Sequence, residues 1–91
     1  MLYAFAAKQV WRRSVMVWET LVDYIAQHFE IDKEDITKET TFEEIRAHEE
    51  DIVDMLFEMS RKFDFVADED DLYGIEDVGT LADLISNLSR E

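Results

Sequence analysis

The chain contains no cysteine and no proline, and only two of its 91 residues are glycine. Without cysteine there is no disulfide framework, no thiolate zinc site and no cysteine nucleophile. The glycine-rich phosphate loop and the Gly-x-Ser-x-Gly turn of serine hydrolases are also missing. Without proline, the element boundaries have to be read from hydrophobic periodicity and capping residues. We therefore expect no independent enzymatic activity.

Basic residues are also scarce, with 9 Lys and Arg against 23 Asp and Glu, so the formal net charge is −14. Residues 1–18 contain Lys8, Arg12 and Arg13 and no acid, which leaves 6 bases against 23 acids, a net −17, in residues 19–91. Such a surface repels nucleic acid phosphates and anionic membranes and favours basic protein surfaces as partners. We expect neither nucleic acid nor membrane binding.

The length allows one small domain, which buries roughly 60 to 65% of the surface of the unfolded chain. Hydrophobic residues make up 47% and aromatic residues 12% of the sequence. Both values exceed those of an acidic disordered tail. We therefore expect a folded, monomeric module.

Residues 1–15 are expected to form an N-terminal extension of a domain at residues 16–91. Their apolar run, residues 2–7, is too short to span a membrane, and the positive charges follow this run, unlike those of a secretory signal. An acid-free, arginine-bearing start is also the composition of an organellar transit peptide, which remains an alternative. We favour an extended first helix or an early start codon, and hence a cytoplasmic location.

Four segments carry apolar residues at the three- and four-residue steps of amphipathic helices. They lie at residues 17–29, 49–63, 68–73 and 77–88, with Gly74 ending the third and Asp77 capping the fourth. The inward-facing positions are Val17, Trp18, Leu21, Val22, Ile25, Phe29, Ile52, Met55, Leu56, Met59, Phe63, Val78, Leu81, Leu84, Ile85 and Leu88. No segment alternates like a strand, so we expect an all-α fold of four helices.

A long polar connection, residues 30–47, joins the first two helices. Its apolar residues are Ile31, Ile36, Phe42 and Ile45. We expect them to hold the connection against the core, as long ordered loops require. Thr41 and Glu44 have the spacing of a capping box around a short turn.

The segment 42–55 reads Phe-Glu-Glu-Ile-Arg-Ala-His-Glu-Glu-Asp-Ile-Val-Asp-Met. It resembles the centre of an acyl carrier protein, where an apolar residue, two acids, Leu and Gly lead to Asp-Ser-Leu and an acidic helix. Further similarities lie at residues 31–37, 61–65 and 77–85, in the family's order, so the resemblance covers about residues 17–88. It implies an acyl-carrier-protein-like four-helix bundle with a long first connection and a short third helix.

The attachment triplet of the family is absent. Arg46 replaces the usual Gly, and Asp, Ser and Leu are replaced by His48, Glu49 and Glu50. In the family, the serine hydroxyl carries a 4'-phosphopantetheine arm through a phosphodiester, whereas a carboxylate would form a labile mixed anhydride. Glu49 therefore occupies the cofactor position of the family, but we expect it to be unmodified and expect no other cofactor.

The resemblance also implies a function, because the acidic second helix of the family docks on basic patches of synthases and transferases. The corresponding acids here are Glu49, Glu50, Asp51, Asp54 and Glu58. We expect a domain similar to carriers of fatty acid or polyketide biosynthesis that acts through protein contacts. Two alternatives remain: a functional carrier with an altered or displaced attachment site, and a binder of a small apolar ligand.

His48 precedes three acids, a combination that suggests a metal or acid-base site. Consecutive residues of a helix point in different directions, so neighbours in sequence do not converge on one ion. We favour a solvated helix start and expect no metal site.

Overall fold

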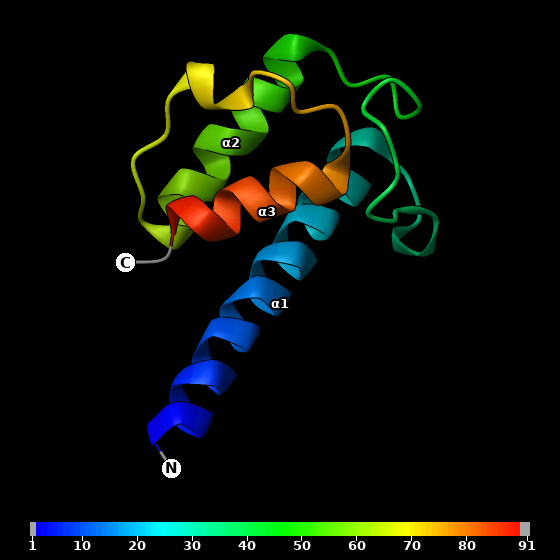
Figure 1. Ribbon diagram of the computed structural model, residues 1–91. Helices are drawn as coiled ribbons and strands as arrows, with labels where there is room; N and C mark the ends of the chain where they lie inside the picture. The colour runs from blue at the N-terminus through cyan, green and yellow to red at the C-terminus, as the bar shows by residue number, and fades with distance from the viewer. Residues whose placement is uncertain (1, 90–91) are drawn as a thin grey trace.

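The computed structural model describes the backbone of residues 2–89 and the side chains of residues 14–89. The described chain forms three α-helices, α1 (Leu2–Phe29), α2 (Glu49–Phe63) and α3 (Val78–Leu88), and two 3₁₀ helices, η1 (Lys33–Asp35) and η2 (Glu69–Leu72) (Figure 1). Within residues 2–89, the extended pairing is limited to an isolated bridge between Thr41 and Asp77. The all-α prediction is confirmed.

The short third helix expected at residues 68–73 is a 3₁₀ helix of four residues, η2. Asp68 caps its N-terminus, where the Asp68 carboxylate accepts a hydrogen bond from Asp70 N–H at 2.9 Å. The tight i to i+3 bonds continue from Tyr73 N–H to the Asp70 carbonyl at 3.2 Å. Gly74 follows with φ of 82°, a left-handed conformation that stops the turn before an α-helix can form.

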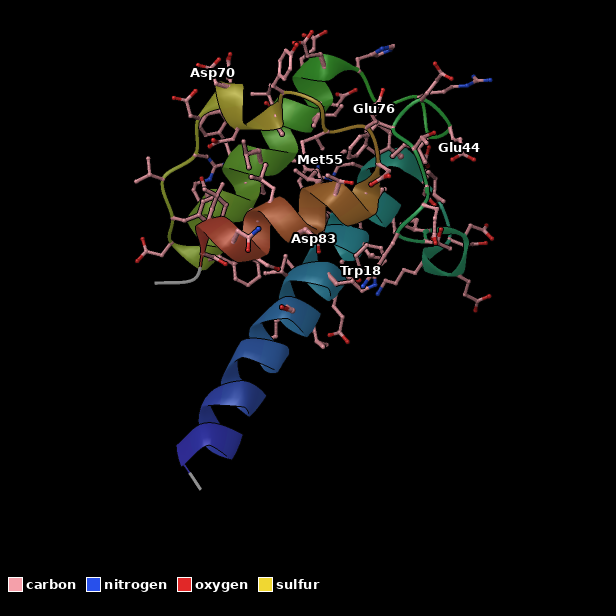
Figure 2. All side chains as sticks on the ribbon, viewed as in Figure 1. Trp18, Glu44, Met55, Asp70, Glu76 and Asp83 are labelled. Carbon is pink, nitrogen blue, oxygen red and sulfur yellow. The ribbon has the colours of Figure 1, made fainter. Side chains whose placement is uncertain are left out.

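The three α-helices enclose one hydrophobic core, and Met55 lies at its centre between them (Figure 2). The buried apolar residues are Val17, Leu21, Val22, Ile25, Ile36, Phe42, Met55, Leu56, Met59, Val78, Leu81, Ala82 and Ile85. The helical stripes predicted from the sequence therefore face inward. The predicted positions at the margin of the core are only half-buried, namely Trp18, Phe29, Ile52, Phe63, Leu84 and Leu88, whereas the small Ala82 is buried.

α1 is a continuous helix that passes through residue 15 without a break, and its C-terminal half packs against α3 and α2. Its N-terminal half extends away from the rest of the molecule (Figure 1). The buried stripe begins at Val17, followed by Leu21 and Ile25 one and two turns later. Among the described side chains of α1, those that contribute to the core thus lie within residues 17–29, as the sequence predicts.

The long connection between α1 and α2 is ordered by its apolar residues and by hydrogen bonds. Ile36 and Phe42 are buried, while Ile31 and Ile45 pack against the core. The predicted capping box is present: Thr41 N–H donates to Glu44 Oε1 at 2.8 Å, and Glu44 N–H donates to Thr41 Oγ1 at 3.1 Å.

The connection also forms a backbone clamp with the start of α3. Phe42 N–H donates to the Glu76 carbonyl at 3.0 Å, and Val78 N–H donates to the Thr40 carbonyl at 2.9 Å. The side chain of Asp77 then accepts from Thr80 N–H at 2.8 Å, which confirms the predicted cap. The amides at the start of α3, which lack partners within the helix, are thus satisfied by the connection and by the cap.

Candidate functional site at the start of α2

Glu49 is the first residue of α2 and is exposed. The start of the helix is capped by one of its own acids, because His48 N–H donates to Asp51 Oδ2 at 2.9 Å. A carboxylate in the first helical turn also interacts favourably with the positive end of the helix dipole. Asp51 therefore stabilises the helix start, whereas Glu49 and Glu50 project into solvent.

Arg46 has a φ of 59°, in the left-handed region that favours glycine. Its N–H donates to the Glu43 carbonyl at 3.1 Å and closes the turn that leads into α2. Ala47 N–H donates to the Phe42 carbonyl at 2.9 Å. The backbone of Arg46 is thus strained at the position where the family that the sequence resembles has glycine.

The five predicted partner-binding acids lie on two sides of α2 rather than on one face. On the α1 side, the carboxylates of Asp54, Glu58 and Asp51 lie close enough to Tyr24 to affect its titration. The pKa of Tyr24 is raised, first by burial and then by these negative charges. Glu49 lies on the other side, next to residues 69–75. Glu50 and Asp54 are four residues apart and lie between the two sides.

An aromatic pair on α1 lies next to this side of α2, and it was not predicted from the sequence. Tyr24 and His28 stack with ring centroids 3.9 Å apart, and His28 Nδ1 lies 3.1 Å from the Tyr24 carbonyl oxygen. The sequence feature that could have predicted this pair is the spacing of four residues, which places two side chains on the same side of a helix. Glu58 on this side is already paired with Arg61 at 2.6 Å, and this hydrogen bond lowers the pKa of Glu58.

The other side of α2 is hollowed. His48, Glu49, Glu50, Val53, Asp54 and Glu69 line an open depression. A groove of about 500 Å³ adjoins it, between the start of α2 and residues 69–75. Its apolar lining consists of Ile52, Val53, Leu72, Tyr73 and Ile75. We call it the α2–η2 groove.

Sequence reasoning missed the α2–η2 groove because the groove depends on how residues 69–75 pack beside α2. Val53 gave a partial signal, since it follows Glu49 by four residues and therefore shares its side of the helix. Tyr73, with 96% of its surface exposed, gave no sequence signal, because it follows an acidic stretch.

The chemistry available at this site is that of charge and apolar contact. Among residues 14–89 no group of three or more His, Cys, Asp or Glu side chains is arranged to hold a metal ion. Ser60, a hydroxyl on the same helix as Glu49, is half-buried near the other end of α2 and donates to the Phe57 carbonyl at 2.6 Å. Across the described helices, none has both the length and the apolar character to cross a membrane.

Comparison with protein-family models and with solved structures finds no match for this chain.

Proposed function

We propose that the chain is an acyl-carrier-protein-like domain that lacks phosphopantetheine and acts by docking α2 on a basic surface of a partner protein. The observation that carries this proposal is the exposed carboxylate of Glu49 at the first position of α2, where the resemblance places the attachment serine. The left-handed Arg46 at the family's glycine position supports the same alignment.

Charge provides the attraction. Glu49, Glu50 and Asp54 form no ion pair within the described residues, so their negative charge is available to a partner. Opposite charges steer the encounter of two proteins, and salt screens this steering over a Debye length of about 8 Å at physiological ionic strength. Association should therefore be fastest in dilute buffer.

The docking test compares two triple charge reversals. The first changes Glu50, Asp54 and Glu58 to Lys on α2; the control changes the exposed Glu19, Glu34 and Asp83 to Lys elsewhere. Because both alter the net charge equally, the comparison isolates the position of the charges. We expect the α2 reversal to slow association at low salt with a partner isolated from the source organism, and the control to slow it much less. Equal rates for the two would rule out α2 as the docking surface.

The absence of the cofactor is tested by intact mass. After incubation with coenzyme A and a broadly specific phosphopantetheinyl transferase, the wild-type chain should gain no mass, because Glu49 has no hydroxyl. A double change, Glu49→Ser with Glu50→Leu, or a triple change that adds His48→Asp, should acquire the phosphopantetheine mass. A stable addition to the wild type, mapped to any residue, would show a carrier with a displaced site.

A small apolar ligand is the second candidate function, and the apolar lining of the α2–η2 groove is the observation that favours it. The acids Glu49, Glu69 and Asp70 at the same groove oppose a ligand with a free carboxylate, because like charges repel. A neutral apolar compound has no such penalty, so titration with a neutral alcohol and with the fatty acid of equal length separates the two ligand types.

A further inference from the structure

The α2–η2 groove has a wall held in place by local hydrogen bonds. Asp70 N–H donates to the Asp68 carboxylate at 2.9 Å, and Ile75 N–H donates to the Leu72 carbonyl at 3.0 Å. Leu72 and Ile75 are half-buried against the core, so their inner sides are fixed by packing while their outer sides line the groove. The wall on η2 is thus formed before any partner arrives.

Ile52 and Val53 of α2 provide the opposite wall. Both are half-buried, and neighbouring positions of α2 contribute Met55 and Leu56 to the core. Gly74 also lines the groove, and no heavy atom lies within 4 Å of the place where its Cβ would be. The side chains of the described residues therefore leave open space next to Gly74.

The charged side chains at the rim of the groove are acidic throughout the part of the chain that the structure describes. Glu49, Glu69 and Asp70 line the groove itself, and Glu50 with Asp54 line the adjoining depression. Asp70 projects outward from η2 at the edge of the molecule (Figure 2). Among the described side chains, residues 14–89, no Lys or Arg lines either hollow. An occupant must therefore combine an apolar group with positive charge close to it.

We propose that the α2–η2 groove receives an apolar side chain from a partner segment in which Lys or Arg residues flank that side chain. The apolar side chain lies between Val53 and Leu72, and the flanking cations face Glu49 and Glu69. This inference rests on the proposed function, because it defines the chemistry of the protein that docks on α2. It adds that apolar burial next to α2, and not charge alone, determines which basic proteins bind.

Two synthetic helical peptides test this inference. One has leucine along one face and lysine on both sides, and the other has serine in place of leucine with the same charge. Isothermal titration calorimetry at physiological salt should show that the leucine peptide binds about tenfold or more tightly, the ratio expected when a leucine side chain leaves water. In two-dimensional NMR spectra, the amide signals of Val53, Leu72 and Ile75 should shift only with the leucine peptide.

A single substitution separates burial from charge. Val53→Asp adds a negative charge at the groove, which would strengthen binding of a cationic peptide if charge alone mattered. We expect it instead to remove most of the leucine preference. The control is Val66→Asp, the same change at a side chain that is 89% exposed and lines neither hollow. It should leave the preference intact, and circular dichroism should show both variants folded.

The outcomes distinguish this inference from the proposed function. If both peptides bind equally and both are weakened by the α2 charge reversal, docking on α2 stands and the groove proposal is overturned. If neither peptide binds at low salt, both proposals fail. Binding of the neutral alcohol decanol in the groove, without a preference between the peptides, would assign the groove to a small apolar ligand and also overturn the inference.

Discussion

Gly79, near the start of α3, lies directly against the backbone of Lys38 in the long connection. Its N–H donates to the Lys38 carbonyl at 2.9 Å. A Cβ atom on Gly79 would lie 2.7 Å from the same oxygen and 2.8 Å from the Lys38 Cβ. The clamp between the connection and α3 therefore requires the absence of a side chain at this position.

Gly79→Ala should destabilise the protein, although replacing glycine by alanine within a helix ordinarily stabilises it by about 0.5 to 1 kcal/mol. Displacement of the connection should outweigh that gain and lower the free energy of unfolding by about 1 to 3 kcal/mol, the usual range for an overpacked site. Urea unfolding measures the change. Asn87→Ala, at an exposed position of the same helix, is the control and should shift stability by less than about 0.5 kcal/mol. A more stable Gly79→Ala protein would contradict the close contact.

Arg46→Gly should stabilise the protein by about 0.5 to 1 kcal/mol, because it relieves a left-handed conformation at φ of 59°. Arg46→Ala removes the same charge but keeps a side chain at Cβ, so it serves as the matched comparison. Thermal unfolding of the two variants should place the glycine variant higher. The same melting temperature for both would show that any gain comes from loss of the arginine charge.

Core substitutions should follow burial rather than residue type. Ile25→Ala and Leu56→Ala should each reduce the free energy of unfolding by about 2 to 5 kcal/mol, since both side chains are fully buried. The half-buried Leu84 should show a smaller loss with the same substitution. Because a chain of this length has a total stability of about 5 to 14 kcal/mol, the two larger losses should be visible in denaturant titrations. A Leu84→Ala loss equal to the other two would contradict the packing.

Acid should weaken the caps of the connection and of α3. The Thr80 hydroxyl and N–H hold the pKa of Asp77 below its usual range, and bonds from Thr41 N–H and Oγ do the same for the pKa of Glu44. A lowered folded pKa contributes stability that is present above the unfolded value of about 4 and is lost as pH falls through the folded value.

Stability should therefore decline below about pH 4, and Asp77→Asn should flatten part of that decline, because asparagine caps a helix without titrating. Urea unfolding at neutral and acid pH measures the difference. An unchanged pH profile in Asp77→Asn would show that this cap does not contribute to the acid dependence.

Much of the fold follows from local pattern. The apolar stripes of α1, α2 and α3 and the caps at Asp77 and Thr41 depend on residues a few positions apart, so the sequence alone predicts them. The 3₁₀ geometry of η2 was not predicted, because in so short a segment before Gly74 an α-helical turn and a 3₁₀ turn need almost the same number of residues. The strain at Arg46 is also invisible in composition or periodicity.

The candidate site was predicted less completely. Glu49 and Glu58 are nine residues apart, about two and a half helical turns, so helix geometry already places them on opposite sides of α2. The acidic composition of the segment alone does not show this separation. The α2–η2 groove, by contrast, joins Val53 to Leu72 through tertiary packing, and no local pattern specifies that approach.

The clamp between the connection and α3 has a topological consequence for this site. By joining Phe42 to Glu76, it closes the intervening chain into a ring. Every residue that lines the α2–η2 groove belongs to that ring. The two walls are therefore connected both through the turn after α2 and through the clamp, and neither wall can drift from the other without local opening of the ring. A partner that fits the groove would thus also stabilise a closure whose own residues, Phe42 and Glu76, do not line the groove.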